Sequence, residues 1–255
     1  MNCRRPLTCL SSLLLTMALA MALGACAKPQ KINLNPPHGD VQYQAWSVFA
    51  PDLVPGQELH ENVIVVFHGF RSAVPNGFYK RVRELFRKTH HVVGINYDYL
   101  DPPSTAAHLK AFAREQLQGR RVIVLGTSLG GYWANWFAQY IGAHAAGLVN
   151  PVVDPVTWIT RHLGKTKHNP RRDVDFTASE ADQREYAAME RIPDTGMRRL
   201  VVLTRDDQHL DFTIARDHYQ GQAGVQMALF ENGGHTLNLK KHPARATLKK
   251  FVYER

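Results

Sequence analysis

A serine flanked by glycines lies in the run Gly-Thr-Ser-Leu-Gly at residues 126–130. A continuous apolar segment, 122–125, precedes this run, and an apolar segment with helical periodicity, 132–140, follows it. This order predicts a strand, a sharp turn and a helix, with Ser128 at the apex of the turn. Such a turn strains the serine backbone, and glycines two positions away on either side prevent collisions with neighbouring elements. Ser128 is therefore a candidate nucleophile.

A serine nucleophile needs a base within hydrogen-bond reach and a carboxylate that orients the base. In a hydrolase with a serine on this type of turn, the acid and then the histidine follow the serine along the chain. His235 comes directly after the apolar segment 225–230 and a pair of glycines, and Asp207 comes after the apolar segment 200–203. We expect His235 to be the base and Asp207 the acid.

The acid has two alternatives in the sequence. Asp206 lies beside Asp207 in the same predicted loop, and Asp154 follows the preceding strand. Asp207 is preferred because Leu210, three residues further on, supplies the apolar anchor that hydrolases of this shape usually have. Asp206 remains the main alternative acid.

The negative charge that develops on the substrate oxygen requires two backbone N–H donors. The N–H of Leu129, directly after the serine, is one candidate. The N–H of Phe70 is the other, because Phe70 lies in the loop after the apolar segment 63–67 and Gly69 gives the backbone room to turn inward. We interpret His68 in the same loop as a packing residue rather than a catalytic base.

Apolar segments of strand length alternate with helical patterns along most of the chain. Near-continuous apolar strands in this alternation predict an α/β fold with a parallel sheet covered on both faces. The functional residues should then lie beyond the carboxyl ends of the strands. The expected strands are 63–67, 92–95, 122–125, 147–149, 200–203 and 225–230, and the expected helices are 77–89, 105–117, 129–140, 211–219 and 243–252.

The first residues have the features of an export signal. A basic start is followed by a short apolar stretch, 7–23, and then by small residues before Cys26. This ending resembles a bacterial lipobox, which predicts a signal peptide over 1–25 and attachment of lipid, with acyl chains such as palmitate, to Cys26. Ala27 rather than Asp after the cysteine favours the outer membrane, facing the periplasm. An uncleaved anchor helix and ordinary signal-peptide cleavage remain alternatives.

The composition limits the partners of the chain. Its formal net charge is +9, and its basic residues are scattered rather than gathered into a stripe with aromatic residues. We therefore expect a solvated basic surface that favours anionic neighbours such as lipid headgroups, and no nucleic-acid partner. The thirteen histidines show no metal-ligand spacing, so no metal and no cofactor is expected. The sequence gives no prediction of the oligomeric state.

The length after the signal suits one domain. A polar segment rich in Pro and Asn, 26–38, is predicted to be a tether, and 39–255 a single hydrolase domain. Within it, 154–197 contains no clear strand and is predicted to form a small lid over the site.

From about residue 63 to the C-terminus the chain resembles the α/β-hydrolase superfamily, and in particular the small bacterial YqiA-like esterases. The resemblance rests on the following motifs: His-Gly-Phe at 68–70, Gly-Thr-Ser-Leu-Gly-Gly-Tyr at 126–132, Val-Asn-Pro at 149–151, Asp207 with Leu-Asp-Phe at 210–212, and Gly-Gly-His at 233–235. It implies esterase activity on short acyl esters with Ser128, Asp207 and His235 as a triad. Members of that family lack a signal peptide, so its substrates are not carried over. The acid loop is one residue longer here, which keeps Asp206 open as the acid.

These observations predict a serine carboxylic-ester hydrolase that forms an acyl-enzyme on a small acyl-ester substrate at the cell envelope. A thioesterase or an acyltransferase uses the same residues and stays open. A hydrolase-fold envelope protein that only binds its ligand is the alternative from another class. The full set of nucleophile, base, acid and oxyanion motifs argues against it, because binding does not require them.

Overall fold

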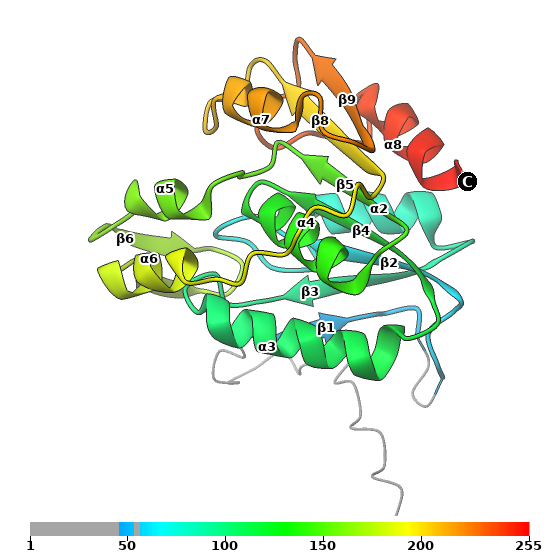
Figure 1. Ribbon diagram of the computed structural model, residues 1–255, viewed down its shortest axis with the longest axis horizontal. Helices are drawn as coiled ribbons and strands as arrows, with labels where there is room; N and C mark the ends of the chain where they lie inside the picture. The colour runs from blue at the N-terminus through cyan, green and yellow to red at the C-terminus, as the bar shows by residue number, and fades with distance from the viewer. Residues whose placement is uncertain (1–45, 54–56, 255) are drawn as a thin grey trace, which may run out of the picture. The chain divides into compact units, whose positions relative to one another are not determined.

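The computed structural model describes residues 46–53 and 57–254, all within one compact unit, Asn33–Arg255. Seven strands in the described residues form a central sheet (Figure 1). β1 lies at one edge and pairs antiparallel with its neighbour, whereas the other pairings are parallel. In spatial order the strands are β1 (Ser47–Phe49), β3 (His91–Asn96), β2 (Asn62–Phe67), β4 (Arg121–Thr127), β5 (Ala145–Val149), β8 (Arg199–Thr204) and β9 (Val225–Phe230).

The sheet separates two hydrophobic cores. Successive side chains of a strand point to opposite faces, and in β2 Val63 and Val65 enter one core while Ile64 and Val66 enter the other. All four side chains are fully buried. The continuous apolar runs of the sequence therefore arise from strands covered on both faces, as predicted for a parallel sheet.

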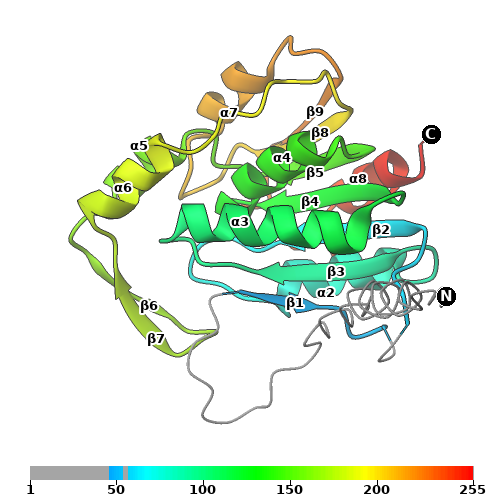
Figure 2. The same ribbon diagram turned by 60° about the horizontal axis from the view of Figure 1, so that its bottom comes forward.

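Helices cover both faces (Figure 2). α3 (Pro102–Phe112), α4 (Leu129–Ile141) and α7 (Phe212–Tyr219) contribute to the first core. α2 (Gly77–Phe86) and α8 (Ala244–Tyr253) contribute to the second. A single π-helical turn, η1 (Ala113–Leu117), continues α3. This arrangement confirms the predicted α/β fold class, with helices on both faces of a mostly parallel sheet.

Each of the six expected strands and five expected helices is present, with shifted ends. The helix expected over 105–117 begins at Pro102, because the Asp101 carboxylate accepts a hydrogen bond from the N–H of Ser104 at 2.9 Å and the prolines suit a first turn. β1, which pairs with β3, was not predicted, because three residues are too short to form an apolar pattern.

The segment 154–197 was predicted to lack a clear strand, and this prediction is wrong. It contains an antiparallel hairpin between two helices. The hairpin was missed because exposed residues alternate with more buried ones and most of them are polar or charged, so no continuous apolar run marks it. The elements are α5 (Pro155–Thr160), β6 (Thr166–Asn169), β7 (Val174–Thr177) and α6 (Glu180–Ala187).

The predicted signal peptide, Cys26 and the tether over 26–38 lie outside the described residues and stay predictions. Of the helices in the described part of the chain, none is long and apolar enough to cross a bilayer.

Candidate active site

Ser128 lies on a sharp turn between β4 and α4, with φ 55° and ψ −128°. Residues other than glycine rarely adopt a positive φ. Here a hydrogen bond holds the turn: the Ser128 N–H donates to the Val149 carbonyl at 3.0 Å. The flanking glycines are required by close approach. A Cβ at Gly126 would lie 2.0 Å from the Gly130 oxygen, and one at Gly130 would lie 2.3 Å from the His68 oxygen. The close packing expected from the motif is present.

His235 is hydrogen-bonded to Asp207. His235 Nδ1 and Asp207 Oδ2 are 2.7 Å apart, and the Asp207 side chain is only 2% exposed. The other Asp207 oxygen, Oδ1, accepts from the N–H groups of His209 at 2.8 Å and Leu210 at 2.9 Å. Both oxygens are thereby held in place, so that Asp207 accepts a hydrogen bond from the Nδ1–H of His235 and the Nε2 atom is left for another partner.

The surroundings keep Asp207 ionised. Burial alone raises the pKa of this carboxyl, but the hydrogen bonds from His235, Leu210 and His209 outweigh burial, and the pKa lies below its usual value. A carboxylate that stays charged beside an imidazole stabilises the protonated imidazole that forms when the base accepts a proton.

Asp206 has a different surrounding. Its carboxylate accepts from the N–H groups of Gly233 at 3.1 Å and Gly234 at 2.7 Å, the two residues before His235. The N–H of Gly234 is the main cause that lowers the Asp206 pKa. Asp206 therefore holds the loop that carries the histidine, whereas Asp207 contacts the histidine itself. The third candidate acid, Asp154, accepts from Val156 and Thr157 N–H groups as the N-cap of α5.

Ser128 and His235 line the same cavity, of about 490 Å³, which also reaches the predicted oxyanion loop. Its walls combine apolar side chains with polar ones. Its residues come from the carboxyl ends of β2, β4 and β9, from the loops after them, and from the first half of α2. Of the residues in the 154–197 insertion, Arg171 lines it. The described lining residues are Gly69, Phe70, Ser72, Asn76, Gly77, Phe78, Arg81, Thr127, Ser128, Arg171, His235, Thr236, Leu237, Asn238 and Leu239.

The loop after β2 passes directly beside the serine. A Cβ at Gly69 would lie only 3.2 Å from the Cβ of Ser128, so glycine allows this approach. Within the described chain, the N–H groups of Phe70 and Leu129 donate to no other residue. The N–H of Leu129 is free because Leu129 begins α4, and the first N–H groups of a helix have no intrahelical partner. Both predicted oxyanion donors are thus available.

His68 is a buried packing residue, as interpreted from the sequence. Its ring stacks on Tyr97 at a centroid distance of 4.5 Å, and its Nδ1 lies 2.7 Å from the Gly69 oxygen. Burial, followed by the charge of Arg172, lowers the pKa of His68 to about 3. The ring is therefore neutral at ordinary pH and supports the loop.

Sequence reasoning missed the role of Asn150, which follows β5. Its buried amide donates to the carbonyls of Gly234 at 3.1 Å and His235 at 3.3 Å, and its oxygen accepts from the Thr204 N–H at 3.0 Å. One side chain thus joins the ends of β5 and β8 to the histidine loop. A polar residue directly after a buried strand was the available signal.

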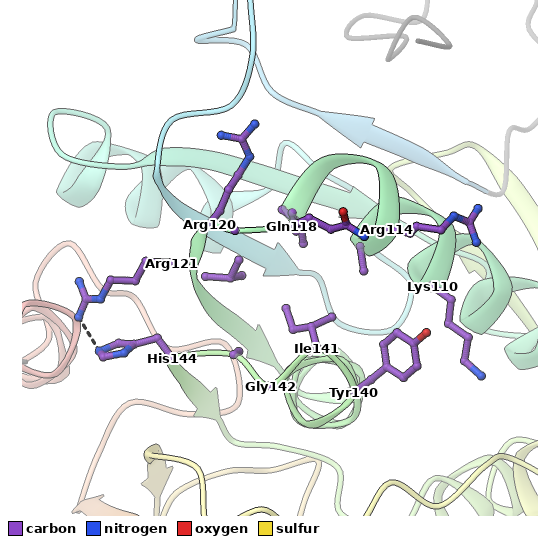
Figure 3. A pocket seen from close by; sticks show the side chains of 14 residues that line it. Lys110, Arg114, Gln118, Arg120, Arg121, Tyr140, Ile141, Gly142 and His144 are labelled. Carbon is purple, nitrogen blue, oxygen red and sulfur yellow. Dashed lines mark hydrogen bonds between the residues drawn. The ribbon is translucent and has the colours of Figure 1, made fainter. Parts of the chain in front are cut away.

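A second cavity, of about 770 Å³, lies beside the amino end of β4, whereas Ser128 follows the carboxyl end of that strand (Figure 3). Basic side chains surround it, yet Lys110 pairs with Glu190 at 2.5 Å and Arg120 lies 3.5 Å from Glu58. Neither Ser128 nor His235 lines it. Although this cavity is the larger of the two, it is therefore not the site of the serine chemistry. Over residues 46–53 and 57–254, no group of three or more His, Cys, Asp or Glu side chains is arranged to hold a metal ion.

Residues 63–250 match the model of UPF0227, described as an uncharacterised protein family. The chain belongs to the UPF0227 family. This match confirms the resemblance to the YqiA-like proteins over the span from residue 63. A UPF0227 protein of Shewanella woodyi is 27% identical over 158 residues, which cover 61% of this chain and 81% of that protein.

Solved structures share the fold of this UPF0227 member. Est1E from Butyrivibrio proteoclasticus has a TM-score of 0.57 at 11% identity, covering 81% of this chain and 90% of its own. The esterase EaEST from Exiguobacterium antarcticum has a TM-score of 0.56 at 17% identity, covering 82% and 96%. A putative hydrolase from Agrobacterium vitis has a TM-score of 0.55 at 17% identity, covering 81% and 92%. Together these neighbours establish an α/β-hydrolase fold.

Proposed function

We propose that this chain is a serine carboxylic-ester hydrolase in which Ser128 is the nucleophile, His235 the base and Asp207 the acid. The proposal rests mainly on one cavity, which both Ser128 and His235 line. Ser128 has a strained backbone, and His235 is hydrogen-bonded to the buried carboxylate of Asp207. These residues come from three loops far apart in the sequence. A binding protein has no need of that combination. The esterase fold neighbours are consistent with the proposal.

In the proposed reaction, Ser128 Oγ attacks the ester carbonyl carbon while His235 Nε2 takes the hydroxyl proton. The N–H groups of Phe70 and Leu129 hold the resulting oxyanion. The ester C–O bond then breaks, and His235 returns the proton to the departing alcohol. Water repeats the same steps on the acyl-enzyme and releases the acid, with the Asp207 carboxylate stabilising the imidazolium each time.

Reaction with a fluorophosphonate probe tests whether one serine is activated. We expect labelling of Ser128, and Ser128→Ala should abolish labelling and reduce hydrolysis of a short chromogenic ester by about 10⁴-fold or more. Ser104→Ala, a serine on α3 outside the cavity, serves as the matched control. Hydrolysis by Ser128→Ala within tenfold of wild type would reject Ser128 as the nucleophile. A wild-type protein that is neither labelled nor active would leave a binding role.

The three alternatives share the acyl-enzyme. The group that leaves when it forms, an alcohol or a thiol, distinguishes an esterase from a thioesterase, and the acceptor that removes the acyl group distinguishes both from an acyltransferase. The proposal expects water to be the acceptor and an oxygen ester the better substrate. Product analysis with a matched thioester, and with added alcohol acceptors, measures this directly. Preferential transfer to an alcohol would replace the hydrolase with a transferase on the same residues.

We also propose that lipid on Cys26 tethers the enzyme to the cell envelope, at the outer membrane and facing the periplasm. Support comes from the sequence alone: a basic start, a short apolar stretch and a cysteine preceded by Leu-Gly-Ala. Intact-mass measurement of membrane-extracted protein should give an N-terminus at Cys26 with added acyl mass. An unmodified N-terminus, or a wholly soluble mature protein, would reject the tether without affecting the triad.

A further inference from the structure

The loop after β2, residues 68–72, carries the proposed oxyanion donor Phe70 in a strained conformation. Arg71 has φ 55°, a left-handed value that residues with side chains adopt at a cost. Strain of this kind persists only where the surrounding structure holds it. The contacts that hold this loop come largely from the hairpin β6–β7, which lies about 100 residues further along the chain.

Hydrogen bonds to the hairpin hold the two loop residues that follow Phe70. Arg71 Nε donates to the His168 carbonyl on β6 at 2.8 Å. The side chain of Asn169, which is fully buried, donates to the Ser72 carbonyl at 3.3 Å and to the Tyr99 hydroxyl at 3.1 Å. The Asn169 oxygen accepts from the N–H of Arg171 at 2.9 Å, which fixes the orientation of its amide.

Aromatic packing fixes the Phe70 side chain as well. The Phe70 ring contacts the ring of Phe176 on β7 at a centroid distance of 5.2 Å, and that of Tyr99 at 5.0 Å. It also contacts Trp158 and His162, from α5 and the residues after it, at 4.6 and 4.9 Å. Three of these four partners belong to the insertion. Arg172, between β6 and β7, reaches His68 Nε2 at 3.3 Å and so contacts the other end of the loop.

We propose that the hairpin β6–β7 is the positioning element of the oxyanion hole, with Asn169 and Phe176 as its positioning residues. The inference rests on the proposed function and deepens it, because it assigns a role to the insertion that differs from covering the site. An oxyanion donor acts only when its N–H points at the oxygen that gains charge, and removing one such donor costs about 10²–10³ in kcat. Displacements of about 1 Å are enough to matter. A hairpin that holds the ring of Phe70 and the two residues after it restricts that displacement.

The test uses the full-length protein with Asn169→Ala and Phe176→Ala, assayed with a short neutral chromogenic ester. We expect kcat to fall about 10- to 100-fold in each while KM changes less than about threefold, because the donor acts on the transition state rather than on the bound ester. Phe176→Tyr, which keeps the ring, should stay within about threefold of wild type. Thr166→Ala on the same hairpin is the matched control, since its exposed hydroxyl contacts only Thr177.

A second measurement separates positioning from general loosening of the fold. A trifluoromethyl ketone forms a tetrahedral adduct with an activated serine, and its oxyanion needs the same donors. We expect its inhibition constant to weaken in proportion to the loss of kcat/KM in Asn169→Ala and Phe176→Ala, and to stay unchanged in Thr166→Ala. If Asn169→Ala does not fold, Phe176→Leu provides the same comparison at a partly exposed site.

Unchanged kcat in the folded variants, or equal losses in the control, would overturn the positioning role. A loss of activity equal to the fraction of unfolded protein at the assay temperature would also overturn the positioning role. The proposed function fails separately, through Ser128→Ala that still hydrolyses the ester. Inactive Ser128→Ala with fully active hairpin variants would therefore reject only the inference drawn from the hairpin.

Discussion

Replacing either of two adjacent carboxylates with its amide should have unequal effects. In Asp207→Asn, one side-chain atom faces the N–H groups of His209 and Leu210, as Oδ1 does now. That position requires the amide oxygen, so the NH₂ group is turned toward His235 Nδ1. Two N–H groups cannot face each other, and His235 then carries its proton on Nε2, where it cannot accept the proton of Ser128. The amide thus selects the wrong tautomer.

The size of the loss follows from this tautomer and from the missing charge. A wrong tautomer in a triad costs about 10⁴-fold in kcat, which corresponds to about 5.5 kcal/mol of transition-state stabilisation. Asp206→Asn acts otherwise, because its amide keeps at most one of the bonds to Gly233 and Gly234. We expect it to destabilise the histidine loop and to cost about tenfold or less in kcat.

The assay is hydrolysis of a chromogenic ester at saturating concentration, with a thermal unfolding curve for each variant to confirm folding. The ratio of the two kcat values is the decisive quantity, and it should exceed about 10²-fold in favour of Asp206→Asn. A larger loss in Asp206→Asn would assign the orienting acid to Asp206. Equal small losses would show that His235 needs no carboxylate and would refute the tautomer argument.

Two further predictions concern the supports of the site. Asn150→Ala should lower the unfolding free energy by about 1–3 kcal/mol, measured by denaturant titration, because the buried N–H of Thr204 loses its acceptor. It should also lower kcat for ester hydrolysis, because the histidine loop loses the hydrogen bond from Asn150, and an unchanged kcat would contradict this role of Asn150. For pH, the folded protein holds the pKa of His68 at about 3, whereas the unfolded chain has an ordinary value near 6.5. The unfolded state therefore binds more protons between these values, and stability falls as the pH drops from about 6.5, by up to about 1.4 kcal/mol per pH unit for this residue. His68→Gln should reduce that slope in denaturant titrations at pH 7, 6 and 5, and parallel slopes would exclude the contribution.

The sequence was most informative where apolar burial set the pattern. The strands β2, β4 and β8 are buried on both faces and therefore read as continuous apolar runs. The hairpin β6–β7 could not be found in this way, because exposed residues alternate with more buried ones and Lys, His and Asp occupy several positions. Its strands are formed by pairing with each other and by contact with the loop after β2, which a local pattern does not record.

For the site, the motifs identified the loops but not the side-chain geometry within them. Asp206 and Asp207 lie in one loop, and the direction of each carboxylate depends on which backbone N–H groups fold back toward it. The role of Asn150 depends on β5, β8 and the histidine loop meeting at one point. These contacts depend on the order of the strands in the sheet. β5 and β8 are neighbours in space, although 49 residues lie between Val149 and Arg199 in the sequence.

Backbone strain is unevenly distributed over the described part of the chain. Its non-glycine residues with positive φ are Arg71, Ser128, Asn150 and Asp173, and the first three follow the ends of β2, β4 and β5. Laboratory selection for heat resistance alone would favour glycine at such positions, because glycine adopts a positive φ without a steric cost. At Asp173, an exposed residue between β6 and β7, that change would be harmless. After β2, β4 and β5 the same change would disturb the arrangement of residues around Ser128. Thermostability and activity are therefore expected to compete at the carboxyl ends of these strands.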